Sequence, residues 1–97
     1  MSLAVNFSPE SRETFSSIYQ FVLQKFGERS AHEFALKTDK TIRLIAKNPL
    51  MYKASAIDKQ VRIGIISKQT SVFYEVTPEA INLIFFWDNR QEPLIEP

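Results

Sequence analysis

The chain has 97 residues, 44% of them hydrophobic and only two of them glycine, a composition typical of one compact domain (residues 1–97) with one hydrophobic core. It contains no cysteine, which excludes disulfide bonds, a thiolate nucleophile and cysteine-based metal sites. Twelve Lys and Arg against eleven Asp and Glu give a net charge of +1, so binding of a polyanion would need a local basic patch.

The first predicted elements are a short strand and a helix. Residues 4–7 form a strand candidate that is too brief to be stable unless it joins a larger sheet. Ser8-Pro9-Glu10 then supplies an N-cap, a proline at the first helical position and an acid in the first turn. A helix ending at Gly27 is predicted by apolar residues at spacings of three and four, which we interpret as core: Phe15, Ile18, Tyr19, Val22 and Phe26.

A second helix is predicted to follow almost at once. Ser30-Ala31-His32-Glu33 has the form of a capping box, and a helical pattern of apolar residues continues as far as Asn48-Pro49. The connection between the helices is so short that they should form an antiparallel hairpin. Residues 50–60 show no clear periodicity and should form a loop.

Three β-strands are predicted in the second half of the chain. Residues 61–66, 71–76 and 81–87 are rich in β-branched and aromatic side chains, and the polar stretches between them indicate two hairpins. Residues 91–97 contain two prolines and should form a tail. The element order β-α-α-β-β-β predicts an α+β fold with a helical hairpin packed on a largely antiparallel sheet. The place of the first strand in this sheet stays open.

A choice of strand register sorts the side chains of the sheet onto two faces. We place Ser71 opposite Ile66 and Ile81 opposite Val76. One face is then almost entirely apolar and should be covered by the helices: Ile63, Ile65, Val72, Tyr74, Val76, Ile81, Leu83, Phe85 and Trp87. The other, open face mixes charged and large apolar side chains: Arg62, Gly64, Ile66, Ser71, Phe73, Glu75, Asn82, Ile84, Phe86, Asp88 and Arg90.

Four apolar residues of this open face form a candidate docking patch: Ile66, Phe73, Ile84 and Phe86. The first strand, the loop or the tail could cover them. Alternatively, a partner protein could bind there as a helix in a groove or as an added strand. We favour the docking interpretation, because a plain solvated face carries few large apolar groups.

The order and spacing of these elements resemble the RelE/ParE superfamily, the toxins of bacterial type II toxin-antitoxin modules. The resemblance extends from Asn6-Phe7-Ser8-Pro9-Glu10 through the paired helices to Phe86-Trp87-Asp88-Asn89-Arg90-Gln91-Glu92-Pro93. It implies a growth-inhibiting toxin of a plasmid-stabilisation type of module. A cognate antitoxin would neutralise it in a hetero-oligomeric complex, and the docking patch would be the antitoxin-binding site.

The superfamily has two kinds of mechanism, and the resemblance implies one of them. RelE-like toxins cut mRNA in the ribosomal A site, which requires groups that move protons and cations that hold the phosphate. Arg62 matches the first basic position of the second strand and Arg90 the arginine after the last strand, so both are candidate catalytic residues. Gly64 and Ser71 stand where the family carries further bases, and residues 91–97 contain no Tyr or His. We therefore favour ParE-like inhibition of DNA gyrase, with a RelE-like ribonuclease as the alternative and a non-toxic interaction protein as a third reading.

Each candidate residue also has a structural interpretation. Arg62 lies opposite Glu75 in our register and could form a surface ion pair, and Asp88 could neutralise Arg90. Tyr74 should lie in the core, with its hydroxyl group satisfied.

No metal ion, cofactor or membrane is expected. His32 is the single histidine, and without a second ligand or a triad partner it should be exposed to solvent. No apolar run approaches the ~20 residues that span a bilayer, and no signal-peptide pattern is recognisable. We expect a cytoplasmic protein.

Overall fold

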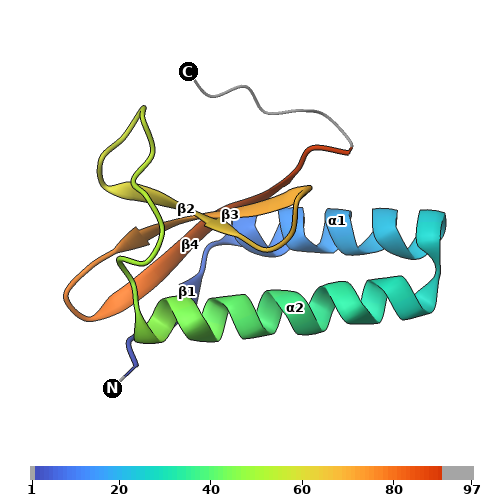
Figure 1. Cartoon of the computed structure of the whole chain (residues 1–97), viewed down its shortest axis with the longest axis horizontal. Helices are drawn as coiled ribbons and strands as arrows, with labels where there is room; N and C mark the ends of the chain where they lie inside the picture. Colours follow the sequence, from blue (N-terminus) through green and yellow to red (C-terminus); the bar gives the residue numbers. More distant parts are fainter. Residues whose placement is uncertain (1, 91–97) are drawn as a thin grey trace.

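The computed structural model describes residues 2–90 of the chain. Two helices lie on one face of a four-stranded sheet, and the hairpin that they form extends along that face (Figure 1). The elements are β1 (Ala4–Phe7), α1 (Pro9–Phe26), α2 (Glu28–Lys47), β2 (Val61–Ile65), β3 (Thr70–Val76) and β4 (Ala80–Asp88). This is the predicted order, so the α+β fold class is confirmed. The predicted tail, residues 91–97, lies outside the described residues.

The ends of α1 follow from the signals in its sequence. The Oγ of Ser8 accepts a hydrogen bond from the backbone N–H of Ser11 at 2.9 Å, and Pro9 is the first helical residue. Gly27 ends the helix with φ = +97°, a value that side chains with a Cβ rarely adopt. Both predicted ends are confirmed.

The start of α2 differs from the prediction. The helix begins at Glu28 because the carbonyl of Gly27 already accepts a hydrogen bond from the N–H of Ala31 at 3.1 Å. A single residue therefore joins the helices, and the predicted capping box at Ser30 lies inside the helix. The predicted C-terminal end is correct, since α2 stops at Lys47.

The sheet is mixed, with strand order β1-β4-β3-β2. β1 joins it at one edge, where it runs parallel to β4 with Phe7 opposite Leu83. At the other edge, the loop before β2 folds back onto that strand. Ser55 N–H donates to the carbonyl of Val61 at 2.6 Å, and Ile63 N–H donates to that of Lys53 at 3.3 Å. Backbone from this loop therefore covers part of the outer edge of β2.

The first hairpin has a register one residue away from the predicted one. Ile65, not Ile66, lies opposite Ser71. The hairpin closes with Ile66 N–H donating to the carbonyl of Thr70 at 3.0 Å, so that its loop has an odd number of residues. The hydroxyl of Ser67 tightens this loop by accepting from the N–H of Thr70 at 3.2 Å. The one-residue shift moves every β2 side chain to the other face of the sheet.

The second hairpin starts in the predicted register, with Val76 opposite Ile81, but a bulge interrupts it. Tyr74 lies opposite Leu83 and Phe73 opposite Phe85, so Ile84 is the extra residue. Helix α1 and its N-cap satisfy the backbone groups that the bulge releases. Ser8 Oγ donates to the carbonyl of Ile84 at 2.7 Å, and Phe86 N–H donates to Thr14 Oγ1 at 2.8 Å.

The core lies between the helices and one face of the sheet. Phe15 of α1 joins its parts, since its ring lies 5.4 Å from the ring of Phe34 in α2 and 5.5 Å from that of Phe86 in β4. Tyr74 is fully buried and its hydroxyl donates to the carbonyl of Pro49 at 3.0 Å, as predicted for a core tyrosine. Phe26, predicted to belong to the core, is 50% exposed because it ends α1 beyond the sheet. Among residues 2–90, no helix is long and apolar enough to cross a membrane.

Candidate functional site

The open face of the sheet consists of three rows of cross-strand neighbours. Residues directly opposite each other share a face, so the pairings define the rows. They are Val61–Glu75–Asn82, Ile63–Phe73–Phe85 and Ile65–Ser71–Trp87. The last two rows form an apolar and aromatic surface, which we call the aromatic face: Ile63, Ile65, Phe73, Phe85 and Trp87.

The aromatic face is ordered by ring stacking and retains binding capacity. The rings of Phe73 and Phe85 are stacked with centroids 4.4 Å apart, and Ile65 beside them is 50% exposed. The indole Nε1 of Trp87 is buried and has no hydrogen-bond acceptor within the described part of the chain. A buried donor without an acceptor is rare in a folded protein.

A polar row that crosses β1, β4 and β3 borders the aromatic face at the end of the sheet where β4 begins. Asn6 Nδ2 donates to Asn82 Oδ1 at 3.0 Å, and Asn82 Nδ2 donates to Glu75 Oε1 at 3.5 Å. The open face therefore has an apolar region with polar side chains at one end, and protein-binding surfaces also carry polar groups at their margins.

The structure retains part of the predicted docking patch and corrects the rest. Phe73 lies on the open face as predicted but is only 8% exposed, and Ile84 is the half-buried extra residue of the bulge. Ile66 and Phe86 are 5% and 1% exposed and belong to the core under the helices. Their predicted position on the open face was wrong. The loop between β2 and β3 is one residue shorter than predicted, which places Ile66 on the helix-covered face, and the bulge at Ile84 places Phe86 on that face too. Ile63, Ile65, Phe85 and Trp87 take the opposite positions.

Arg62 is held by the backbone of the loop before β2. It lies opposite Tyr74 rather than Glu75, and its Nη1 donates to the carbonyl of Tyr52 at 2.5 Å. The predicted opposition to Glu75 was therefore wrong by one residue. Burial raises the pKa of the Tyr74 hydroxyl above its ordinary value, and the charge of Arg62 only partly offsets this effect. A tyrosine with a raised pKa that already donates to a carbonyl is a poor general base.

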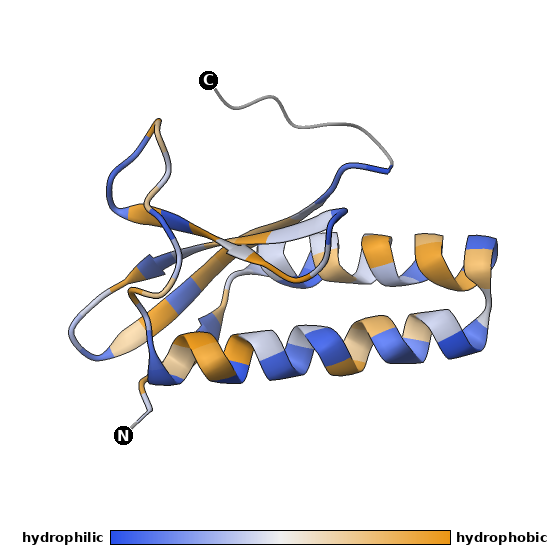
Figure 2. Cartoon of the chain, viewed as in Figure 1, coloured by the Kyte–Doolittle hydropathy of each residue, from blue (hydrophilic) through white to orange (hydrophobic). Residues whose placement is uncertain are grey.

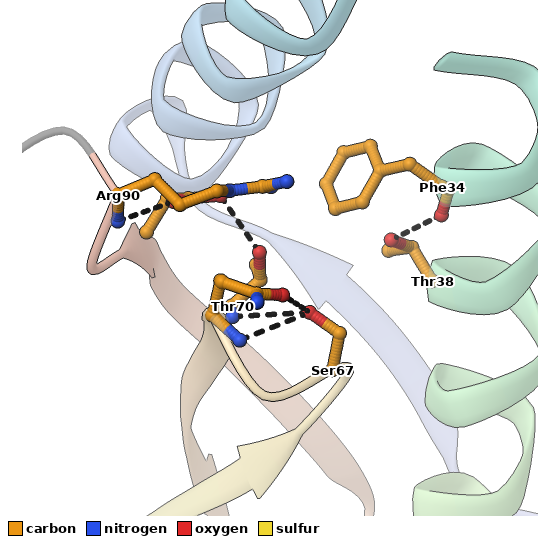
Figure 3. Close-up of polar contacts among 7 residues, drawn as sticks. Phe34, Thr38, Ser67, Thr70 and Arg90 are labelled. Carbon is orange, nitrogen blue, oxygen red and sulfur yellow. Dashed lines mark hydrogen bonds and ion pairs between the residues drawn. The ribbon is translucent and has the colours of Figure 1, made fainter. Parts of the chain in front are cut away.

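Arg90 is bound by the carboxylate of Asp88, as the alternative interpretation of the sequence foresaw. Its Nη2 and Nε lie 2.6 and 3.0 Å from the two carboxylate oxygens. The guanidinium also lies 5.8 and 5.6 Å from the ring centroids of Phe21 and Phe26. Thr70 Oγ1 donates to the same carboxylate at 2.8 Å, so Asp88 joins the end of β4 to the start of β3 (Figure 3).

The charges of this cluster shift both pKa values. Burial by itself would raise the pKa of Asp88. The hydrogen bonds from Arg90 and Thr70 and the charge of Arg90 outweigh burial, so the pKa of Asp88 lies below its ordinary value. The hydrogen bond to Asp88 raises the pKa of Arg90 against the opposing effect of burial. The pair is ionised at neutral pH and acts as a structural tie.

The structure does not bring the two candidate catalytic arginines together. Arg62 is level with Leu83 across the sheet, and Arg90 lies beyond Asp88, which is five residues further along β4, roughly 16 Å at about 3.3 Å per residue. Gly64, where the family carries a base, lies under α2. A Cβ at this position would meet Ile45 Cδ1 at 2.9 Å and Val72 Cγ1 at 3.0 Å. A long basic side chain has no room there.

A hollow of about 340 Å³ lies beside the Arg90 cluster, between the hairpin of helices and the loop after β2. In Figure 3, Arg90 and Ser67 lie on one side of it and Phe34 of α2 on the other. The hollow has an apolar base and a rim of both charges: Val22, Phe26, Ser30, Glu33, Phe34, Lys37, Ser67, Gln69 and Arg90. Its lining carries two cations, Lys37 and Arg90, and one acid, Glu33, and Arg90 is already bound to Asp88, so the hollow offers no cluster of free cations to a polyanion.

Residues 2–90 contain no group of three or more potential metal ligands. His32 is exposed on α2, as predicted.

No protein-family model matches the chain, and no curated protein matches it in sequence. Solved structures match it in shape. The chromosomal ParDE TA system from P. aeruginosa contains a chain with a TM-score of 0.75 and 10% identity, covering 90% of this chain and 96% of that one. A chain of the E. coli DinJ-YafQ toxin-antitoxin complex matches with a TM-score of 0.63 and 9% identity, covering 95% of this chain and 98% of that one. A chain of the YoeB dimer from Staphylococcus aureus matches with a TM-score of 0.62 and 15% identity, covering 90% of this chain and 97% of that one.

The chain has the RelE/ParE fold. The likeness covers nearly the whole of both chains in each comparison, although identities of 9–15% make it a likeness of fold. The resemblance that the element order indicated is therefore confirmed at the level of structure.

Within this RelE/ParE fold, sequence reasoning missed the aromatic face for two separate reasons. The hydroxyl of Ser67 can stabilise a tight turn, and the β-branched Thr70 is suited to a strand. The sequence was therefore also compatible with a loop of only three residues between β2 and β3. The bulge has no comparable signal in β4, because the group that satisfies it is Thr14 of α1. The misplacement of Phe85 and Trp87 follows from that distant contact.

Proposed function

We propose that this chain is the toxin of a type II toxin-antitoxin pair and that its aromatic face binds the antitoxin. The observation that carries the proposal is the RelE/ParE fold, whose structural neighbours include a ParDE TA system and a DinJ-YafQ toxin-antitoxin complex. The aromatic face supports the location, since it combines a stacked pair of rings with the exposed Ile65 and a polar row at one end.

We further propose that the toxin acts by binding its target, with DNA gyrase as the favoured one, rather than by cutting mRNA. Four observations support this mechanism. Arg62 donates to a backbone carbonyl, Arg90 is neutralised by Asp88, and the two lie far apart along the sheet. Gly64 has no room for a base. A RelE-like ribonuclease would need its cations to converge on one phosphate.

The mechanism is tested by inducing the wild-type chain in cells without the antitoxin. Growth, transcript integrity by primer extension and the SOS response are followed in the same culture. We expect growth arrest, an SOS response with double-strand breaks and intact transcripts. New in-frame cleavages that disappear in Arg62→Ala or Arg90→Ala, with antitoxin binding retained, would favour the ribonuclease. No effect on growth would refute the toxin proposal.

The binding site is tested by co-expression with the cognate antitoxin and by titration calorimetry. Ile65→Ser should weaken antitoxin binding at least tenfold, because it replaces an apolar side chain that is 50% exposed on the aromatic face by a hydroxyl. Ile57→Ser is the matched control, since Ile57 is 73% exposed in the loop before β2 and does not belong to the aromatic face as defined above. Equal binding by both variants would exclude the aromatic face as the antitoxin site.

A further inference from the structure

The outer side of α2 carries a second surface that neither the core nor the aromatic face uses. Leu36, Lys40, Leu44 and Lys47 follow at spacings of four, four and three, which places them on one side of the helix. Leu36 and Leu44 are 57% and 41% exposed. The buried residues of α2, such as Ile45, lie on the opposite side of the helix, against the sheet.

The surface continues past the end of the helix. Lys47 lines a shallow hollow together with the following turn, which contains Leu50 and Met51. These two side chains are 66% and 47% exposed. We call this whole surface the α2 ridge: Leu36, Lys40, Leu44, Lys47, Leu50 and Met51. In Figure 2, apolar and polar bands alternate along α2 as far as its C-terminal end.

The α2 ridge has an excess of positive charge. Residues 36–47 contain the cations Lys37, Lys40, Arg43 and Lys47 but only one acid, Asp39. Asp39 is bound to Arg43 at 2.8 Å. Within residues 2–90, the side-chain ion pairs of α2 are this one and Arg29–Glu33, so Lys40 and Lys47 have no acidic partner.

We propose that the α2 ridge binds an acidic amphipathic helix of a partner protein. Leucine or isoleucine side chains of that helix would pack between Leu36, Leu44 and Met51, and its carboxylates would pair with Lys40 and Lys47. A nucleic acid would use the lysines but leave the leucines exposed. Four of the eight large hydrophobic side chains exposed in the described part of the chain belong to this ridge, which favours a protein helix.

This inference goes beyond the antitoxin proposal, because the sheet separates the α2 ridge from the aromatic face. Both surfaces could be occupied at the same time. The antitoxin proposal and the α2-ridge proposal can also be refuted independently of each other.

The test uses a fluorescein-labelled helical peptide of 15 residues with leucine at i, i+4 and i+7 and glutamate beside them. Its binding to the full chain is followed by fluorescence anisotropy, with circular dichroism of each variant to check folding. We expect saturable binding that Leu44→Ser and Lys47→Glu each weaken at least tenfold, and that 300 mM salt also weakens. Matched controls are Ile65→Ser on the aromatic face and Lys68→Glu on the loop after β2, both of which should leave the peptide affinity unchanged.

Three results would overturn the proposal. The peptide could fail to bind the wild-type chain, or the control variants could weaken it as much as the ridge variants do. The third is duplex DNA binding that Lys47→Glu weakens and Leu44→Ser does not, which would make the ridge a polyanion site. Antitoxin affinity unchanged in Leu44→Ser but reduced in Ile65→Ser would show that the two surfaces are independent.

Discussion

Replacement of Asp88 by alanine should destabilise the fold by about 3–5 kcal/mol at neutral pH. The carboxylate is completely buried and accepts hydrogen bonds from Thr70 Oγ1 and from the backbone and side chain of Arg90. Alanine leaves the buried Thr70 hydroxyl without its acceptor, at a cost of about 1–3 kcal/mol. It also removes the charged bonds of Arg90, about 1.5–3 kcal/mol, part of which water recovers because this side chain is 26% exposed.

Urea unfolding followed by circular dichroism at 222 nm measures this cost. Thr70→Val provides the matched variant, since it deletes one hydrogen bond without leaving a buried donor unpaired. Its own cost should be about 1 kcal/mol. The double variant should lose less stability than the two single variants lose together, because the Thr70 hydroxyl that Asp88→Ala would leave unpaired is no longer present.

The pH dependence gives an independent check on the same pair. The pKa of Asp88 is lower in the folded state than its unfolded value of about 4. Its contribution is therefore complete above about pH 4 and is lost as the pH falls through the folded pKa. The difference between wild type and Asp88→Ala should stay constant from pH 6 to 8 and narrow below pH 4. A difference under about 1 kcal/mol at pH 7, with an unchanged urea slope, would refute the reasoning.

Three further substitutions test the backbone positions that shape the fold. Gly64→Ala should cost about 1–3 kcal/mol in urea unfolding, because its Cβ would meet Ile45 Cδ1 at 2.9 Å, and an unchanged midpoint would show that α2 yields freely. Gly27→Ala should destabilise the fold by about 1–2 kcal/mol, because alanine is strained at φ = +97°, and should therefore lower the melting temperature. A higher melting temperature would mean that the connection between the helices adopts another conformation. Thr14→Val should cost about 1–3 kcal/mol by leaving the N–H of Phe86 unpaired, and faster hydrogen exchange at Phe86 would report it directly, while unchanged exchange would contradict the bulge assignment.

Most of the fold could be predicted from local signals. The Ser8 cap, the left-handed Gly27 and the end of α2 before Pro49 depend on residues within a turn of each other, and the structure has all three. The start of α2 was misplaced because two caps competed, and the one nearer to α1 prevailed. The edge position of β1 could not be predicted, since four residues carry no pairing preference of their own.

The candidate site was harder to predict, because a shift of one residue in the pairing of two strands moves each side chain to the other face of the sheet. In β3 the prediction was correct: Phe73 lies on the open face and Tyr74 in the core. In β2 a loop one residue shorter reversed Ile65 and Ile66. In β4 the bulge at Ile84 reversed everything that follows it. Local propensity identified the strands but did not determine which side of each strand faces the helices.

The bulge also links the helices to the proposed function. Without it, strand alternation would carry Phe86 to the open face and bury Phe85 and Trp87. The hydrogen bond from Phe86 N–H to Thr14 Oγ1 fixes the bulge from the helical layer, so the composition of the aromatic face is determined by α1 as much as by β4. The two matched arginines fit the same view. Each holds the frame of the sheet, so the antitoxin site that we propose on the open face consists of apolar side chains rather than arginines.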